Sequence, residues 1–480
     1  MKARPLMVQG TMSNAGKSLT VAAICRYLTR EGYRVAPFKS QNMALNSFVT
    51  ADGSEMGRAQ AVQAEASGKL PDVRMNPVLL KPTTDTGSQV IVMGKPIGNM
   101  AAREYFRYKS KLVPSILSAY ESLAAENDVI VIEGAGSPVE LNLNNNDFVN
   151  MGLAEMLKAP VLLVGDIDRG GIFAQLCGTL SLLEKKQFEM VKGLIVNKFR
   201  GDLTLFEEGK KLLAERSGKP VLGVMPYAKI DIDDEDSLSE RLACKKTAET
   251  DIAVIRLPKI SNFTDFAPLE RADNCSVRYI EKPEEFGSPD LLIIPGTKST
   301  ISDLRFLKES GLAEQIVAAA HRKIPVFGIC GGFQILGESV EDPSGMECGG
   351  WETGLGLLPV RTVFKEEKCL QEVRGRIEGV SGIFSSLNGL TYSGYEIHMG
   401  VSENNKAVIS KGNVYGTYVH GIFDERGIVS TIVSALTGKD YTEDLDTRSY
   451  KEKNYELLAD IFEKNMDTDL LKKIIEEGIR

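Results

Sequence analysis

Cys330 stands in the run Gly328-Ile-Cys-Gly-Gly332, between a short apolar segment and a helical pattern. This is the G-x-C-x-G form of the nucleophile elbow, in which small neighbours permit a strained turn that lifts the sulfur clear of a sheet. The N-terminus of the helix that follows favours the thiolate. We therefore predict that Cys330 is a nucleophile, and that an oxyanion is bound by backbone N–H groups of Gly331 and Gly296.

A thiol nucleophile of this kind needs a histidine as its base, and the chain holds three histidines. We favour His420, which ends an apolar strand-like run before a glycine, a place that suits an exposed imidazole. His398, in a strand-like segment, is the alternative, and we interpret His321 as a surface residue at a helix end. The group that orients His420 is left open between Glu396 and Asp424.

A second constellation lies near the N-terminus, where residues 10–18 read GTMSNAGKS after an apolar run and before a helical pattern. Glycines there let backbone N–H groups surround a phosphate. We predict that this loop binds ATP, with Lys17 at the β- and γ-phosphates and Ser18 as a ligand of Mg²⁺. The other predicted cradle residues are Gly10, Thr11, Asn14 and Gly16.

Mg²⁺ in such a site also requires carboxylates. Glu133, which ends an apolar strand-like run, is the predicted second ligand, and Asp52 is a further candidate that a turn aspartate explains equally well. Asp166 and Asp168 follow another apolar run and are open between metal or substrate contacts and turn formation. Asn197 also ends such a run and is predicted to hydrogen-bond adenine.

The elements that must position these residues alternate along most of the chain. Apolar runs rich in Val, Ile and Leu are typical of parallel strands buried on both faces, and helical patterns lie between them. The sequence therefore predicts an α/β fold with doubly wound parallel sheets. Expected strands are 5–10, 34–38, 89–93, 128–132, 160–164, 193–196, 220–224, 252–257, 290–295 and 325–330. Expected helices are 17–30, 56–67, 104–126, 205–217 and 301–320.

A chain of 480 residues is expected to form two or three domains. An acidic segment at 231–236 and the polar stretch that follows indicate a boundary near residue 248. We predict domains over 1–248 and 249–440, with a helical tail over 441–480 whose amphipathic pattern begins at residue 448. Residues 338–352 are expected to be rich in loops.

Composition restricts the partners. Asp and Glu outnumber Lys and Arg by 65 to 57, which argues against a protein that neutralises nucleic-acid phosphates, although a local basic pocket for an anionic small molecule remains compatible. No apolar stretch reaches the roughly 20 residues that span a bilayer, and the first residues lack a secretory signal pattern. Seven scattered cysteines without a C-x-x-C pair indicate a reducing compartment. We predict a cytoplasmic protein with neither nucleic-acid nor membrane partners.

The motifs together resemble a known family. Residues 328–334 (GICGGFQ) and 416–424 (GTYVHGIFD) are similar to a class I glutamine amidotransferase domain. The long glycine loop at 10–18 resembles that of the dethiobiotin-synthetase-like branch of P-loop amidoligases. In this order the two halves resemble the cobyric acid synthase family. Its finer motifs are SNAGKS (13–18), KSQNMALNS (39–47), MNPVLLKP (75–82), EGAGSPVELNL (133–143) and DIDRGGIFA (166–174).

The resemblance implies that the b, d, e and g carboxylates of adenosylcobyrinic acid a,c-diamide become amides, through acyl phosphates, with ATP and glutamine as co-substrates. Cys330 and His420 are the implied catalytic pair, although the Glu that most class I domains carry two residues after the histidine is replaced by Ile422. Rival interpretations are a cobyrinic acid a,c-diamide synthase, a scaffold ATPase with a vestigial thiol domain, and a non-catalytic corrinoid-binding module. The order of the amidations and the oligomeric state stay open.

An anionic substrate predicts basic side chains near the phosphate loop. The candidates are Lys39, Arg58, Lys81 and Arg169, each of which is equally well explained as an ordinary surface charge.

Overall fold

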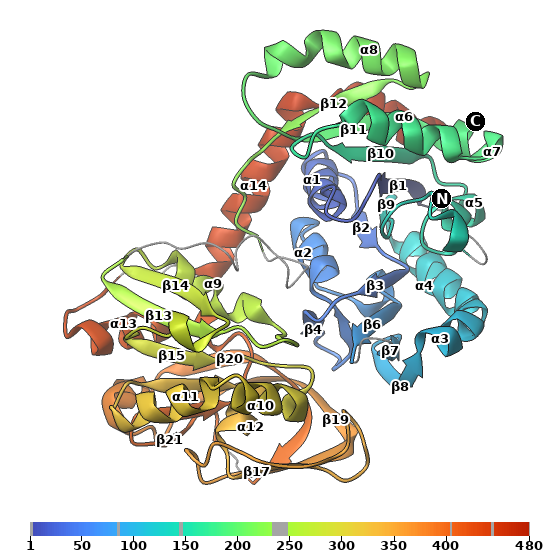
Figure 1. The fold of residues 1–480 in the computed structure, drawn as a ribbon. Helices are drawn as coiled ribbons and strands as arrows, with labels where there is room; N and C mark the ends of the chain where they lie inside the picture. The colour runs from blue at the N-terminus through green and yellow to red at the C-terminus, as the bar shows by residue number, and fades with distance from the viewer. Residues whose placement is uncertain are drawn as a thin grey trace.

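The computed structural model describes residues 3–83, 87–143, 147–232, 248–403, 406–442 and 446–479, arranged as two lobes (Figure 1). The predicted acidic linker lies outside the described residues from residue 233 onward, and the predicted boundary at 248 comes directly after that range. Each lobe is built around a six-stranded, mainly parallel sheet.

The first lobe holds an all-parallel sheet in the order β12-β11-β10-β1-β9-β2. Its strands are β1 (Arg4–Gly10), β2 (Val35–Phe38), β9 (Val129–Glu133), β10 (Val161–Asp166), β11 (Val191–Phe199) and β12 (Val221–Pro226). The strand order runs outward from β1 in both directions, so the carboxyl ends of β1, β9 and β10 meet at a topological switch point. Ligands of open α/β sheets bind at such points.

Helices cover both faces of this sheet, as doubly wound topology requires. One face carries α1 (Lys17–Arg30), α2 (Arg58–Ala66), α14 (Thr447–Asn465) and α15 (Thr468–Glu477). The other carries α4 (Val113–Glu126), α5 (Met151–Leu157), α6 (Ile172–Leu182), α7 (Lys185–Met190) and α8 (Glu207–Ser217).

The helices at the end of the chain return to the first lobe, where α14 runs beside α1 and β12 (Figure 1). The Phe462 ring is fully buried, with its centroid 5.8 Å from that of Tyr27. Arg26 of α1 pairs with both Glu452 and Glu456 of α14. The amphipathic helices expected after residue 448 are present, and they form an outer layer of the first lobe.

A smaller sheet in the order β3-β6-β7-β8 and a hairpin, β4–β5, complete the first lobe. These strands are β3 (Gln41–Met43), β4 (Ser47–Val49), β5 (Glu55–Gly57), β6 (Val78–Pro82), β7 (Gly87–Val92) and β8 (Lys95–Ala101), and α3 (Ala102–Tyr108) follows. The expected strand at 89–93 corresponds to β7, which pairs antiparallel with both β6 and β8. Met93 and Gly94 both adopt positive φ and form the tight turn to β8. The helix expected from residue 104 is interrupted between α3 and α4, and Pro114 lies in the first turn of α4.

The second lobe is organised around the order β14-β13-β15-β16-β22-β21, parallel except at β21. Its strands are β13 (Thr250–Ile255), β14 (Cys275–Ile280), β15 (Leu291–Ile294), β16 (Val326–Ile329), β21 (Ile409–Lys411) and β22 (Val414–Thr417). Its helices are α9 (Ala267–Arg271), α10 (Thr300–Glu309), α11 (Leu312–His321), α12 (Gly331–Leu336) and α13 (Ile428–Thr437). The single helix expected over 301–320 is two helices, since Gly311 adopts φ 79° between them.

A second sheet of this lobe has the order β18-β17-β19-β20. Its strands are β17 (Ser339–Asp342), β18 (Gly350–Thr353), β19 (Arg361–Arg376) and β20 (Thr391–Ser402). The region 338–352, expected to be rich in loops, thus contributes two short strands. The long β19–β20 pair faces the first lobe, where Tyr395 and Ile397 bury Val49 in a small apolar cluster.

Candidate active site

Cys330 forms a strained turn at the carboxyl end of β16. Its backbone adopts φ 49° and ψ −108°, a conformation that L-residues avoid. A Cβ on Gly332 would lie 2.0 Å from the carbonyl oxygen of Ile294, so the turn depends on a glycine at that position. The backbone N–H of Cys330 donates to the Thr417 carbonyl at 2.8 Å. This is the elbow geometry that the G-x-C-x-G pattern predicts.

His420 lies beside this thiol with its ring almost fully buried, not exposed as the sequence suggested. Its Nδ1 is 2.7 Å from Oδ2 of Asp265, and Oδ1 of the same carboxylate accepts the N–H of Gly421 at 3.0 Å. Burial lowers the pKa of His420, but the charge of Asp265 and the hydrogen bonds to Asp265 and Cys330 outweigh it and raise that pKa to about 10.

Asp265 is a residue that sequence reasoning missed. It lies in the 3-10 turn Phe263–Phe266 of the second lobe, and it occupies the orienting position that we had left open between Glu396 and Asp424. Glu396 instead contacts His398, Gln371 and Cys369. The available signal was slight, because Asn262 and Asp265 follow a strand in a segment that also holds other polar residues, such as Ser261 and Thr264.

The predicted oxyanion donors lie next to the thiol. Gly331 is the first residue of α12, so its N–H has no acceptor within the helix. A Cβ on Gly331 would lie 3.0 Å from the backbone nitrogen of Thr297, and one on Gly296 would lie 3.1 Å from Cε1 of His420. The structure therefore brings Gly331, Gly296 and His420 together around the sulfur.

The other two histidines occupy different surroundings. His398 stacks on Tyr418 with ring centroids 3.8 Å apart, and its Nδ1 is 2.8 Å from the Gly400 carbonyl. His321 is exposed at the end of α11, as the sequence suggested.

The phosphate loop connects β1 to α1 at the switch point. Asn14 and Gly16 both adopt positive φ, 59° and 95°. The ammonium of Lys17 donates to the carbonyls of Met12, at 2.9 Å, and Gly136, at 3.1 Å, which folds it back over the loop. Such a curled loop leaves its N–H groups directed toward an anion.

Asn197 and Thr11 also hold this loop. The amide of Asn197 donates to the Ala15 carbonyl at 2.9 Å and lies so close to Gly16 that a Cβ there would be 1.9 Å from its nitrogen. Thr11 Oγ1 donates to Gln175 at 3.2 Å. The loop from Gly10 to Ser18 and Asn197 therefore form one structural unit, and the contact of Asn197 with adenine stays a prediction.

Glu133 is the centre of a buried polar cluster at the carboxyl end of β9. Its Oε1 accepts from Ser18 Oγ and from Lys39 Nζ, both at 2.8 Å, and its Oε2 accepts from Gln63 at 2.6 Å. A hydroxyl and a carboxylate are oxygen donors that fit Mg²⁺. Asp52 hydrogen-bonds within its own turn, to Thr50 and Ser54, so its part as a third ligand stays a prediction.

The remaining charged candidates lie in three places. The ammonium of Lys198 is 3.0 Å from Oδ2 of Asp166 and also donates to the carbonyl of Asn14. Lys198 therefore connects the end of β10 to the phosphate loop. Asp168 pairs with Arg200, and Arg169 is exposed. Of the basic residues predicted near the cradle, Lys39 forms an ion pair with Glu133. Arg58 is buried at the start of α2, and Lys81 pairs with Glu55 at the contact between the lobes.

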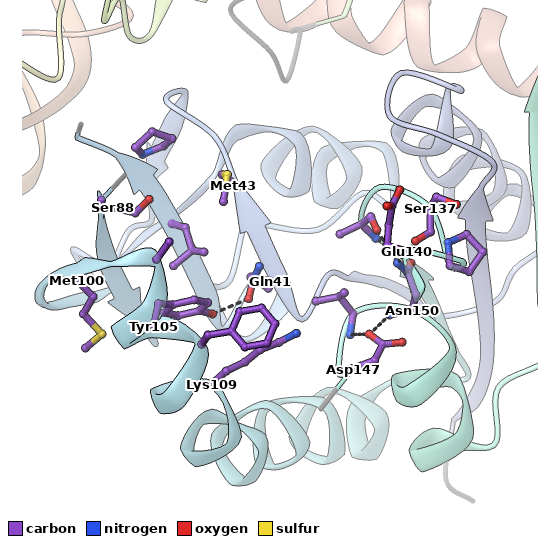
Figure 2. A pocket seen from close by; sticks show the side chains of 18 residues that line it. Gln41, Met43, Ser88, Met100, Tyr105, Lys109, Ser137, Glu140, Asp147 and Asn150 are labelled. Carbon is purple, nitrogen blue, oxygen red and sulfur yellow. Dashed lines mark hydrogen bonds between the residues drawn. The ribbon is translucent and has the colours of Figure 1, made fainter. Parts of the chain in front are cut away.

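A pocket of about 560 Å³ lies between the small sheet, α3 and the segment that follows β9 (Figure 2). Ala135 and Ser137, which flank the Gly136 carbonyl that accepts from Lys17, line it. Apolar side chains from the small sheet and α3 form part of its wall: Met43, Leu80, Pro82, Met100 and Phe106. Lys109 enters this wall over the ring of Phe148, and burial lowers the pKa of its ammonium.

Asn262 connects the thiol site to the first lobe. Its side-chain nitrogen is 3.4 Å from Nε2 of His420, and its Oδ1 accepts the N–H of Ser47 at 3.1 Å. Its own N–H donates to Asn46 Oδ1 at 2.8 Å. Asn262 is buried and adopts φ 53°, so a single residue in a left-handed conformation links the His420 imidazole to β4.

A buried ionic cluster joins the lobes beside this link. Glu55 of β5 pairs with Lys81 at 2.9 Å and with Lys368 of β19, and all three side chains are at most 5% exposed. Burial raises the pKa of Glu55, but the two ammonium charges outweigh burial and hold it well below its usual range.

Comparison with known proteins finds a separate family for each of the two lobes. Residues 6–238 match the CobQ/CobB/MinD/ParA nucleotide binding domain, and residues 251–428 match the CobB/CobQ-like glutamine amidotransferase domain. A nucleotide-binding lobe joined to an amidotransferase lobe defines a glutamine-hydrolysing ligase that uses ATP.

Curated relatives cover the whole chain. A cobyric acid synthase of Ruminiclostridium cellulolyticum is 56% identical over 99% of this chain and 98% of its own. Those of Lachnoclostridium phytofermentans and Alkaliphilus metalliredigens are 53% and 47% identical over 99% and 98% of this chain and 100% and 99% of their own. The chain belongs to the cobyric acid synthase family. Among the described residues, no helix is both long enough and apolar enough to cross a membrane.

Proposed function

We propose that this enzyme converts the b, d, e and g carboxylates of adenosylcobyrinic acid a,c-diamide into amides, giving adenosylcobyric acid. The observation that carries the proposal is the pairing of two chemically different centres, the thiol of Cys330 with His420 in one lobe and the Lys17 phosphate loop in the other. Relatives that match over their full length are named cobyric acid synthase. A cytoplasmic location is part of this proposal, and seven scattered cysteines without a C-x-x-C pair support it.

The first lobe activates the acceptor. A carboxylate resists attack by ammonia because it is an anion with a poor leaving group. Transfer of the γ-phosphoryl group of ATP to a carboxylate oxygen forms an acyl phosphate and releases ADP, and the Lys17 ammonium stabilises the charge on the transferring group. Ser18 and Glu133 would hold Mg²⁺, which when bound would supply further charge neutralisation at the phosphates. Lys39, whose ammonium donates to Glu133, adds a positive charge at the same edge of the sheet.

The second lobe supplies ammonia. The Cys330 thiolate attacks the side-chain amide carbon of glutamine, and the N–H groups of Gly331 and Gly296 bind the oxyanion. His420 protonates the departing nitrogen, so ammonia leaves and a thioester remains. Asp265 holds the imidazole in position through Nδ1. Water then hydrolyses the thioester to glutamate, and ammonia displaces phosphate from the acyl phosphate in the other lobe.

The pocket of Figure 2 is the place that we assign to the acceptor. It adjoins Gly136, against which the Lys17 ammonium lies, so a carboxylate at this end reaches the transferred phosphoryl group. Its apolar wall suits the edge of a large ring system, and Lys109 provides a cation for a second carboxylate. Ammonia is proposed to pass between the lobes, near Asn262, without entering bulk solvent.

Product analysis tests the proposal. The enzyme is incubated with the a,c-diamide, Mg·ATP and glutamine, and the products are weighed by mass spectrometry. Four successive amidations are expected. Amidation of cobyrinic acid at two positions only indicates a cobyrinic acid a,c-diamide synthase, and ATP hydrolysis without corrinoid or glutamine turnover indicates a scaffold ATPase.

Two variants test the division of labour. Cys330→Ala is expected to abolish glutamine-dependent amidation and to keep amidation with added ammonium salts. Lys17→Ala is expected to eliminate amidation with either nitrogen source. Loss of ammonia-dependent activity in Cys330→Ala, or its retention in Lys17→Ala, contradicts the assignment of two separate centres.

A further inference from the structure

Lys109 carries a buried ammonium group that has no oxygen partner within the part of the chain that the structure describes. The residue begins the 3-10 turn Lys109–Leu112, directly after α3, and is 9% exposed. Its ammonium lies 4.7 Å from the ring centroid of Phe148 and 5.7 Å from that of Phe106, and these rings are its only described contacts of charge. Because an ammonium has three N–H donors and is costly to bury unpaired, this arrangement favours an anionic ligand.

Asp147 is the carboxylate that acts on this ammonium, but its oxygens are already engaged. Its Oδ1 accepts the N–H groups of Val149, at 2.8 Å, and Asn150, at 2.9 Å. Its Oδ2 accepts the N–H of Gly152 at 2.8 Å, so the carboxylate fixes the start of α5. Burial lowers the pKa of Lys109, and the attraction of Asp147 opposes that change without cancelling it. The three N–H donors of Lys109 are therefore available to a ligand.

The ammonium of Lys109 points into the pocket of Figure 2. Its nitrogen is directed from the side of α3 toward the side on which Asp147 and Asn150 lie. Gln41 lines the same pocket, and its Oε1 accepts from the Tyr105 hydroxyl at 2.5 Å. This bond leaves the amide nitrogen of Gln41 as a second donor. A cation and a neutral N–H donor in one pocket match the two oxygens of a carboxylate.

The phosphate loop adjoins a different part of this pocket. Ala135 and Ser137 line it there. The residue between them, Gly136, has the carbonyl that accepts from Lys17 at 3.1 Å. Figure 2 shows Ser137 and Lys109 on different sides of the pocket. An acceptor that reaches both sides must carry at least two anionic groups, one for each.

We propose that Lys109, together with Gln41, binds a carboxylate of the acceptor other than the one that is being phosphorylated. The inference rests on the proposed function, which places a corrinoid polycarboxylate in this pocket. One carboxylate anchors the edge of the ring at Lys109 while another meets the transferred phosphoryl group. Lys109 is thus a residue that determines specificity for polyanionic acceptors.

This subsite gives the enzyme a preference among corrinoids. Each amidation replaces a carboxylate by a neutral amide, which removes one candidate partner of Lys109. An amide in this place leaves the buried ammonium without a counter-charge. Acceptors with more carboxylates are therefore favoured over more amidated ones.

Binding of two ligands tests the proposal. Calorimetry without ATP is carried out with the a,c-diamide and with its methyl ester, in which every carboxylate is esterified. Lys109→Met, which keeps an unbranched apolar chain against the two rings, is expected to weaken binding of the diamide about 10- to 100-fold, the effect of losing a charge-assisted hydrogen bond. Binding of the ester is expected to stay within about threefold of wild type, because it brings no charge to Lys109. A merely structural role would weaken both ligands equally.

Kinetics locate the carboxylate that Lys109 binds. With ammonium salts as the nitrogen source, Lys109→Met is expected to raise KM for the diamide about 10- to 100-fold and to leave kcat and KM for ATP near the wild-type values. This is the signature of an anchor that acts equally on the ground state and the transition state. A kcat that falls more than about tenfold at saturating diamide places Lys109 at the reacting carboxylate and overturns the proposal.

The matched control is Lys111→Met, which removes the same charge from an exposed position of the same turn. It is expected to keep the wild-type affinities for both ligands. An unchanged KM for ATP reports that the first lobe of each variant is folded. Equal loss of diamide and ester binding in folded Lys109→Met, or no loss of either, overturns the proposal.

The wild-type enzyme keeps the proposal falsifiable if Lys109→Met does not fold. It is expected to bind the diamide at least tenfold more tightly than the methyl ester, and equal affinities overturn the inference. Failure of the wild-type enzyme to amidate the diamide would instead contradict the proposed function. Amidation of the diamide with an affinity that does not depend on Lys109 contradicts this inference alone, so the two failures are distinguishable.

Discussion

Asp265 and His420 are 155 residues apart in the chain, yet Oδ2 of the carboxylate lies 2.7 Å from Nδ1 of the imidazole. Both side chains are at most 3% exposed. The same carboxylate also accepts the N–H of Gly421, which fixes its orientation. A thiol, an imidazole and a carboxylate therefore form a triad in which the carboxylate comes from the opposite end of the lobe's sequence.

Replacing Asp265 by Asn is expected to lower the kcat of glutamine hydrolysis by about two to four orders of magnitude, because an amide neither fixes the Nδ1–H tautomer nor stabilises the imidazolium. Ammonia-dependent amidation is measured on the same samples and is expected to remain. A kcat for Asp265→Asn within a few-fold of wild type would remove Asp265 from the triad.

The stability of the enzyme is expected to fall at alkaline pH through His420. Its pKa in the folded state, about 10, is above its ordinary value of 6.5. The folded protein therefore holds a proton that the unfolded chain releases, so this contribution is complete below pH 6.5 and is lost as the pH rises through about 10. The decline is at most about 1.4 kcal/mol per pH unit.

Urea denaturation of the wild type and of Asp265→Asn at several pH values between 6.5 and 10 checks this dependence. The difference in free energy of unfolding between the two proteins is expected to shrink as the pH rises. A difference that is constant over this range would show that Asp265 does not raise the pKa of His420.

Asn262→Gly is expected to weaken the connection between the lobes while keeping the left-handed backbone. The variant loses the side-chain contacts to His420 and to the N–H of Ser47, and we expect the ratio of glutamine-dependent to ammonia-dependent amidation to fall about tenfold. Relative to Asn262→Gly, the variant Asn262→Ala is expected to be less stable by about 1–2 kcal/mol, because alanine carries a Cβ that the φ of 53° disfavours.

Lys323→Gly is the matched control, since Lys323 also adopts positive φ in the second lobe but is exposed. It is expected to leave the activity ratio unchanged. If Asn262→Gly leaves the activity ratio unchanged, as Lys323→Gly is expected to do, Asn262 does not couple the two sites.

Phe462→Ala is expected to destabilise the nucleotide-binding lobe by about 3–5 kcal/mol, because it removes a fully buried ring from the layer that α14 adds beside α1. Thermal unfolding with and without ATP measures the effect. Leu457→Ala, on the exposed side of the same helix, is expected to cost much less. Equal effects of the two substitutions would indicate that α14 does not belong to the core of the first lobe.

The alternation of apolar runs and helical patterns was sufficient to predict two mainly parallel α/β sheets, because a strand buried on both faces is mostly apolar and lacks polar alternation. The α1 helix has the predicted bounds, 17–30, since its phosphate loop and its amphipathic pattern agree. Interruptions were harder to predict. Gly311 divides one expected helix into α10 and α11, and the turn at Met93 places β7 in a different sheet, because single backbone conformations override the apolar period there.

Local sequence by itself determined the two reactive turns, at Lys17 and at Cys330, since each is encoded by consecutive residues whose glycines permit one geometry. Only the tertiary structure decided which carboxylate supports His420, where the tail helices pack, and that Asn262 links the lobes. These contacts join residues far apart in the chain, and their side chains leave no periodic signal, because a single hydrogen bond across a packed interface constrains position in space and not spacing along the sequence.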